Sequence, residues 1–161
     1  MSTTIDDDRL RPDDPAVRRR AEETLGARLD EGAAADFVSS LTAPSAPAPI
    51  GATASLNLAV WGKVEVTTDG PDGQRWSYHT TVWGGPAYFG SSVGFLYTAY
   101  DSWSAFFANA HAVHVQGITS PVGVLQVNWF NRDGTPVGQF NGAAGGIGLV
   151  EAGGDGSWRQ L

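Results

Sequence analysis

Three histidines, His79, His111 and His114, have the most versatile chemistry in this sequence of 161 residues. His111 and His114 are three positions apart, a spacing at which two imidazoles on a helix can share one metal ion. On a β-strand the same spacing turns the two side chains to opposite faces. No further ligands cluster beside them, and the chain has no cysteine. The sequence therefore predicts no metal site.

Patterns for nucleophilic or cofactor chemistry are equally weak. The pattern G-x-S-x-G occurs at 90–94, inside the strand expected at 88–97, so it lacks the strand-to-helix turn of a nucleophile elbow. The cluster GAAGGIG at 142–148 lacks the strand–turn–helix context and the ribose-binding residue of a dinucleotide site. We assign the carboxylates Asp101, Asp133 and Glu151 to caps and turns rather than to an acid/base pair. We therefore predict no catalytic residue, no bound cofactor and no enzymatic activity.

Charge and hydropathy limit the partners. The formal net charge of −7 disfavours sequence-independent nucleic-acid binding and a polybasic membrane anchor. No apolar run approaches the ~20 residues that cross a bilayer. The start, MSTTIDDDRLRPDDP, is acidic and has no apolar segment of the kind found in Sec signal peptides. The sequence thus predicts a chain with no membrane span, either cytoplasmic or exported by another route.

The composition changes along the chain and predicts three parts. Residues 1–41 are rich in charge and contain Phe37 as their sole aromatic residue, whereas all six tryptophans follow residue 52. Residues 42–52, TAPSAPAPIGA, read as a linker, because repeated X-Pro bonds exclude helix and favour extended chain. Residues 53–161 form the candidate domain.

The leader, residues 1–41, contains one predicted helix over 15–41. Pro15 suits the first helical turn, with Asp13 or Asp14 as the cap. An apolar stripe recurs every four residues: Val17, Ala21, Leu25, Leu29, Ala33, Phe37 and Leu41. Two interpretations stay open. Val17, Leu25, Leu29 and Phe37 dock onto a partner, such as a secretion system or a particle, or the segment is a mobile tail or a helix resting on the domain.

In the candidate domain, apolar and polar residues alternate with the period of two that is typical of β-strands. Leu56, Leu58, Val60, Val64 and Val66 are apolar at every second position with a bend at Gly62. TDGPDGQ is a turn, and further strands are expected at 76–82 (ending at 84–86), 88–97, 112–119, 122–130, 137–142, 146–151 and 157–160. A short helix in AYDSWSAFFANA turns Trp103, Phe106 and Phe107 inward. About eight antiparallel strands, closed into a barrel, are predicted; such a barrel is just wide enough to be filled by its own side chains.

One aromatic stretch, VWGGPAYFGSSVGFLYTAYDSW at 82–103, could line a ligand pocket or form part of the barrel core. We predict core: Trp83 is packed, and Gly84-Gly85 makes a tight barrel corner, where glycine lets backbones approach closely.

Several motifs in order resemble one known family. TASLNL, VWGG, GFLYT, NWFNRDGTPVGQFNGAAGGIG and GGDGSW, over residues 53–158, are similar to the virulence-associated protein (Vap) family, secreted proteins of intracellular actinobacterial pathogens. The resemblance implies a compact eight-stranded barrel of two Greek-key units with one short helix, and no established catalytic residue. It also implies an action in host phagosomes, for some members linked to acidic membrane lipids. Structural positions of the family fall on Trp83, Gly84, Gly85, Gly142, Gly146 and Gly148.

The resemblance favours a secreted, non-catalytic barrel that acts as an effector through its exterior on a protein or membrane-lipid partner. Two alternatives stay open. A lipocalin-like binder or barrel enzyme would use an open barrel mouth, which requires a cavity of a few hundred Å³ with convergent polar groups. Cargo of a larger assembly would be loaded through residues 1–41.

Overall fold

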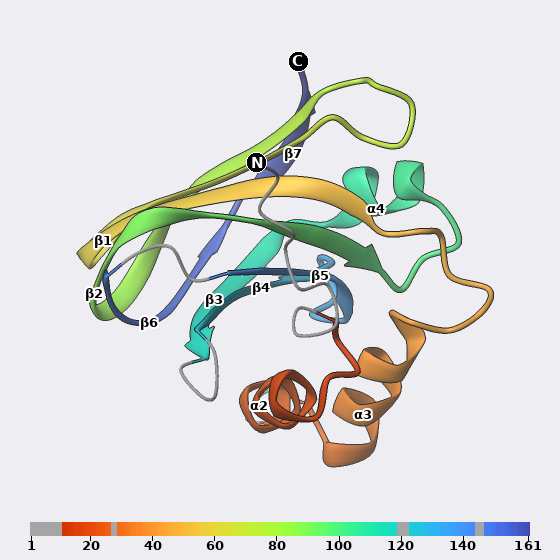
Figure 1. Ribbon diagram of the computed structural model, residues 1–161, viewed down its shortest axis with the longest axis horizontal. Coiled ribbons are helices and arrows are strands. Elements are labelled where there is room, and N and C mark those ends of the chain that lie inside the picture. Colours follow the sequence, from red (N-terminus) through yellow and green to blue (C-terminus); the bar gives the residue numbers. More distant parts are fainter. Residues whose placement is uncertain (1–10, 27–28, 119–122, 144–146) are drawn as a thin grey trace, which may run out of the picture.

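The structure is a computed structural model that describes residues 11–26, 29–118, 123–143 and 147–161 (Figure 1). Its helices are α2 (Pro15–Gly26), α3 (Glu31–Ser40) and α4 (Trp103–Asn109). Its strands are β1 (Ile50–Thr68), β2 (Trp76–Thr98), β3 (Ala112–Ile118), β4 (Val124–Phe130), β5 (Pro136–Ala143), β6 (Ile147–Asp155) and β7 (Ser157–Gln160). Strand β1 thus begins inside the range 42–52 that was predicted as linker.

Two long strands dominate the fold. β1 and β2 pair along almost their whole lengths as an antiparallel hairpin, with one irregularity between Ala59 and Trp61 where the hairpin bends. The turn predicted at 68–74 joins them. The prediction that a strand ends at 84–86 is wrong, because β2 continues through these residues, which pair with β6. Pairing with β6 keeps this glycine-rich stretch extended, while the pairing with β1 is interrupted between Trp83 and Ala87.

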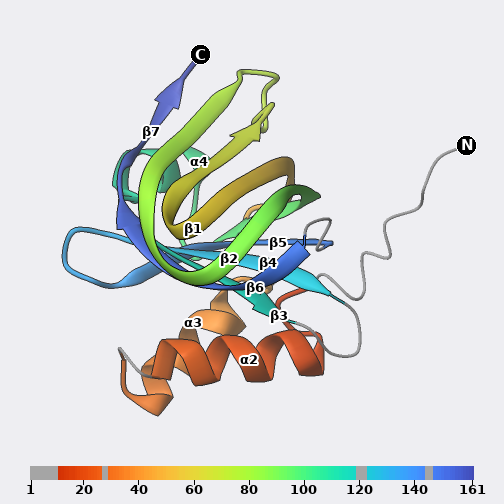
Figure 2. The same cartoon turned by 90° about the vertical axis from the view of Figure 1, so that its left-hand side faces the viewer.

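The sheet closes on itself. β1 occupies one edge of β2, and β7, β6 and β5 follow one another along the opposite edge. β5, β4, β3 and β6 are neighbours in that order, so the pairing of β2 with both β5 and β6 completes a ring of antiparallel strands. The predicted closed antiparallel barrel is confirmed. Figure 2 shows how the bent β1–β2 hairpin wraps over one side of it.

The barrel interior is filled by apolar side chains, many of them aromatic. Trp129 lies edge-on to Tyr78 and Phe106, with ring centroids 5.8 and 5.6 Å apart. Phe106 comes from α4, which begins after its cap Ser102 and buries Trp103, Phe106 and Phe107 as predicted. Burial raises the pKa of the Tyr78 phenol, which stays neutral and donates to the His111 carbonyl. These aromatic side chains thus pack against one another in the centre of the barrel.

The leader forms two helices rather than the one predicted. α2 ends at Gly26, and Asp30 starts α3 by accepting a hydrogen bond from the Ala33 N–H. Asp14 caps α2 as predicted, accepting from Ala16 and Val17 N–H. Glycine is a poor helix former and commonly marks a helix end, so the stripe divides between two helices.

This helical hairpin, α2 and α3, packs on the outside of the barrel below β3, β4 and β5 (Figures 1 and 2). Its stripe forms a second apolar cluster with Tyr97 and Phe130 of the barrel. Val17, Leu25 and Phe37 are buried and Leu29 is partly buried. In this arrangement the protein's own helices and barrel cover these four residues, as the alternative of a helix resting on the domain expects, and docking onto a partner stays a prediction.

Side-chain amides, fully buried, line the barrel face beneath the helical hairpin. Gln126 donates to Asn141 (2.9 Å), Asn141 to Gln139 (2.7 Å), Gln139 to Asn128 (2.8 Å), and Asn128 back to Gln126 (3.1 Å). We call these four residues the amide ring. Each member both donates and accepts, so a polar sheet face becomes able to lie under apolar helices. Gln116 also donates to Gln126 and accepts from Thr24 of α2.

Replacing Gln126 should destabilise the fold strongly. Gln126→Leu keeps the approximate volume but removes the acceptor of both Gln116 and Asn128, leaving two buried donors without it. We expect a loss of about 2–4 kcal/mol in the free energy of unfolding, measured by urea denaturation. Gln160→Leu, which alters an exposed amide pair with Gln74, is the control and should change it by less than about 0.5 kcal/mol. Equal effects of the two variants would contradict the role of the ring.

Deleting residues 1–48 should leave the barrel folded. Among the residues that the structure describes, the barrel core cluster contains none that precedes Ile50. The amides uncovered by the deletion bond to one another. We expect one cooperative thermal transition, with a Tm lower by about 10 °C or less, since 1 kcal/mol shifts the Tm of such a domain by about 4–8 °C. A broad, non-cooperative melt would show instead that the helices complete the domain.

Candidate functional site: an aromatic surface on the β1–β2 hairpin

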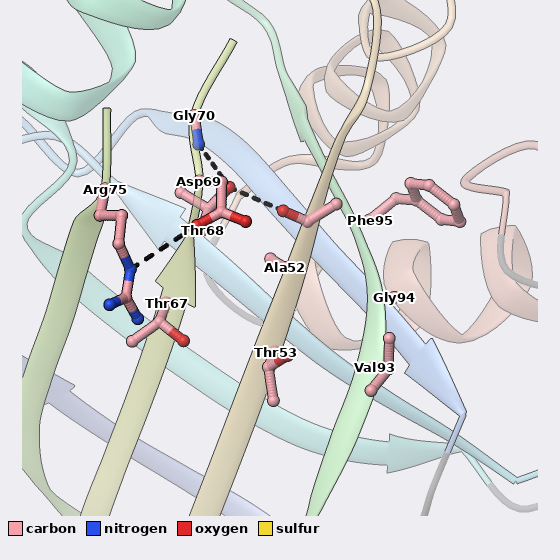
Figure 3. Close-up of a pocket in the computed structure, with 11 residues that line it drawn as sticks. Ala52, Thr53, Thr67, Thr68, Asp69, Gly70, Arg75, Val93, Gly94 and Phe95 are labelled. Atoms are coloured by element: carbon pink, nitrogen blue, oxygen red, sulfur yellow. Dashed lines mark hydrogen bonds and ion pairs between the residues drawn. The ribbon is translucent and has the colours of Figure 1, made fainter. Parts of the chain in front are cut away.

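A groove of about 480 Å³ opens on the barrel wall where β1 begins and ends (Figure 3). Thr53 and Thr67 face it from the two ends of β1, and Val93 lines it from β2. Thr68 donates to the Gly51 carbonyl (2.7 Å) and ties the two ends of β1 together. The groove is therefore a feature of the outer wall, not a mouth leading into the barrel.

The polar groups of this groove are an ion pair and threonine hydroxyls. Asp69 and Arg75 form an exposed ion pair, with 3.6 Å between Oδ1 and Nε. The remaining lining consists of threonine hydroxyls, glycines and apolar side chains, so it offers hydrogen bonds but neither a histidine nor a cysteine. Such a lining can orient a small polar ligand or part of a larger one.

The histidines do not assemble into a site. His79 is exposed on β2. His111 Nδ1 is 3.2 Å from the Gly156 carbonyl, and His114 Nε2 is 3.5 Å from Glu151. Glu151, which was assigned to a cap or turn, lies instead within β6. Within the described residues, no three His, Cys, Asp or Glu side chains gather where they would hold a metal ion, and no described helix is long and apolar enough to cross a membrane.

Beside the groove, the outer face of the β1–β2 hairpin exposes five large apolar side chains. They are Val60 (69%), Trp61 (55%), Trp83 (64%), Phe89 (54%) and Val93 (53%), and we call them the aromatic surface. The indoles of Trp61 and Trp83, opposite one another in register, have centroids 6.3 Å apart and planes tilted by 39°. Val93 also lines the groove, so the two features are continuous.

The bend of the hairpin creates the exposed end of this surface. Val60 has a φ of 71°, a left-handed conformation that is costly for a β-branched residue. The strain coincides with the register irregularity between Ala59 and Trp61. The bend thus places Val60 and Trp61 outward at the cost of backbone strain. Strain that persists beside exposed apolar side chains points to a function of this position.

Gly84 permits this arrangement on β2. Its φ is +154°, and a Cβ here would overlap the carbonyl oxygen of Glu151 on β6. The prediction of a tight corner is thus confirmed at Gly84. It is wrong at Gly85, where a Cβ would meet nothing within 4 Å. The prediction that Trp83 is packed in the core is also wrong, because its side chain lies on the outer face.

The other glycines predicted to be structural have different outcomes. A Cβ at Gly142 would lie 2.6 Å from the Phe140 ring, so a close approach requires glycine there. Gly148 lies in β6, opposite Tyr88 in the register with β2. Gly146 lies outside the described residues.

Sequence reasoning missed the aromatic surface because it treated exposed and buried aromatic residues alike. A signal was present. In β2 the even positions Val82, Tyr88 and Leu96 are buried, so the odd positions Trp83, Phe89 and Val93 must face outward. The alternation is continuous only if the strand does not end at 84–86.

Comparisons with known proteins agree on one family. A model of the Rhodococcus equi virulence-associated protein family matches residues 13–159. The structure of the virulence-associated protein VapD from the intracellular pathogen Rhodococcus equi is similar, with a TM-score of 0.57 and 20% identity, over 70% of this chain and 97% of that one. VapB from the same pathogen gives a TM-score of 0.55 and 20% identity, over 71% and 98%. No curated protein sequence matches the chain.

Gly84 and Gly85 provide a matched pair of substitutions. Gly84→Val should destabilise the fold by about 3 kcal/mol, because the side chain overlaps the backbone of β6 and the residue loses its backbone conformation. Gly85→Val, which enters open space, should cost less than about 1 kcal/mol. Chemical denaturation of both variants measures the difference, and the reverse order would contradict the assignment of the corner to Gly84.

Proposed function

Since this chain belongs to the Rhodococcus equi virulence-associated protein family, we propose that it is an exported, non-catalytic protein that acts on its host by binding through the outer face of its barrel. The binding face is the aromatic surface, and the partner is a molecule outside the bacterial cell, a protein or a lipid surface. The observation that carries the proposal is that Trp61 and Trp83 are both more than half exposed beside the strained Val60.

The energetics of the surface support binding. Single exposed apolar residues are ordinary, but two tryptophans in contact, with further apolar residues on the same hairpin, are typical of interaction sites. Tryptophan is also among the residues that contribute most to binding when a partner excludes water from them. A surface that served only the fold would favour polar side chains at these outward positions.

The barrel interior supports a non-catalytic role. A lipocalin-like binder or a barrel enzyme needs a cavity with convergent polar groups. Here the interior is occupied by Trp129, Tyr78, Phe106, Phe140 and their apolar neighbours. The described histidines contact separate groups, at Gly156 and Glu151. Loading as cargo through residues 1–41 lacks a free apolar stripe, because the helical hairpin already packs on the barrel.

The proposal is tested on host cells. Fluorescently labelled full-length protein should bind to mammalian phagocytes, and Trp61→Ala combined with Trp83→Ala should reduce the bound amount by about tenfold or more. Leu161→Ala, which removes another exposed apolar side chain (65%) outside the aromatic surface, should bind like the parent. Detection of the protein in the culture medium of its own bacterium tests export. Equal binding of all three proteins would refute the assignment of the surface.

Val60 separates function from stability. Val60→Gly removes the left-handed strain and one exposed apolar side chain. We expect the variant to be as stable as the parent or more stable by up to about 1 kcal/mol, yet to bind cells less tightly. Thermal melting and the same cell-binding measurement decide the matter. A variant that loses stability and keeps its binding would contradict a functional role for the strain.

A further inference from the structure

We propose that the aromatic surface and the adjoining groove together bind a neutral glycan chain. This inference rests on the proposed function and makes it specific, because the group recognised on the protein or lipid partner is the glycan chain that it carries. The glycan would lie along the outer face of the β1–β2 hairpin, with sugar rings on the aromatic side chains and sugar hydroxyls in the groove.

Trp61 and Trp83 provide the platform for the sugar rings. One face of many pyranose rings presents only C–H groups, and such a face stacks on an exposed indole while its edge keeps its hydroxyls in water. The centroids of the two indoles are 6.3 Å apart and their planes are tilted by 39°. Two successive sugar rings can therefore each stack on one indole, at different inclinations. Both are held by a sheet paired on either side of Trp83, which limits the entropy lost on binding.

Short polar side chains accompany the apolar ones in register. Asn57 lies opposite Phe89, and Thr53 lies opposite Val93. Between these two pairs Ser55 lies opposite Ser91. Directly opposite residues share a face of the sheet, so hydroxyl and amide groups lie within reach of anything that rests on the aromatic residues. This alternation suits a ligand that is itself apolar on its faces and polar at its edges.

The groove supplies the polar end of the site. Thr53 and Thr67 present hydroxyl groups, and the Asp69 carboxylate lies 3.6 Å from the Arg75 guanidinium (Figure 3). A carboxylate accepts and a guanidinium donates hydrogen bonds, so this pair can hold two adjacent hydroxyls of one sugar. From Phe89 to Val93 an extended strand covers about 13 Å, which fits an oligosaccharide rather than a single sugar.

Charge and composition favour a neutral glycan over the other partners. The chain carries a net charge of −7 and would be repelled by an anionic polymer or bilayer. Lys63 and Glu65, in the part of β1 that follows the bend, carry opposite charges and contribute no net charge to the hairpin. Between the groove and the two tryptophans, threonine, serine and asparagine alternate with the apolar residues, which favours a ligand that has apolar faces and polar edges.

The experiment uses the full-length protein and neutral hexasaccharides of β-glucan, chitin and mannan, with a heparin hexasaccharide as the anionic probe. Binding is followed by tryptophan fluorescence and by calorimetry. We expect at least one neutral probe to bind, with little change between 0.05 and 0.5 M salt, as neutral contacts predict. Trp83→Ala should weaken it by about tenfold or more, and Thr53→Val by about threefold or more. Leu161→Ala should match the parent.

The outcomes separate this inference from the proposed function. If phagocyte binding depends on Trp83 but none of the neutral probes binds, and periodate oxidation of the cell-surface sugars leaves cell binding intact, the glycan inference is overturned and the proposed function stands. Salt-sensitive binding of heparin alone, or a dimer that Trp83→Ala dissociates in sedimentation, also overturns it. If Trp83→Ala leaves phagocyte binding unchanged, the proposed function is refuted, and the glycan inference that rests on it is refuted with it.

Discussion

The amide ring is the interaction on which the relation between leader and barrel depends. Gln126, Asn128, Gln139 and Asn141 lie on the outer face of β4 and β5, where a free barrel would meet water. Each of them is fully buried in the structure because the helical hairpin covers it. Desolvating four amides would oppose this packing by several kcal/mol if their groups lacked partners. The closed set of hydrogen bonds offsets that cost within the sheet, so the helices need to supply little more than apolar contact.

The ring also explains how two chain segments of different composition form one molecule. The barrel closes around its own core, and the helical hairpin adds a second, smaller cluster through Tyr97 and Phe130. Because the amides satisfy one another, the covered face is compatible with water as well as with the helices. A side-chain hydrogen bond from Thr24 of α2 to Gln116 of β3 supplies a direct polar link between the helices and this face.

Much of the fold follows from the sequence. The period-two pattern predicts β1, the turn at 68–74 predicts the β1–β2 hairpin, and the inward aromatic residues of AYDSWSAFFANA predict α4. The predictions are wrong where contacts between residues far apart in the sequence determine the structure. Gly84 continues the strand because β6 pairs with it, and Trp83 faces outward because the alternation of β2 does not stop there. Local periodicity predicts neither the pairing of β6 with β2 nor the place where the helical hairpin packs.

The same bend that shapes the barrel produces the candidate site. Closure of a small barrel from two strands as long as β1 and β2 requires a sharp bend in both, and Gly84 accommodates that bend on β2 without a side chain. On β1 the equivalent region contains Val60 and Trp61, residues that neither relieve strain nor suit water. Asparagine or glycine would fold more readily there. Closure therefore explains the bend, while the proposed binding role accounts for the apolar residues at its tip.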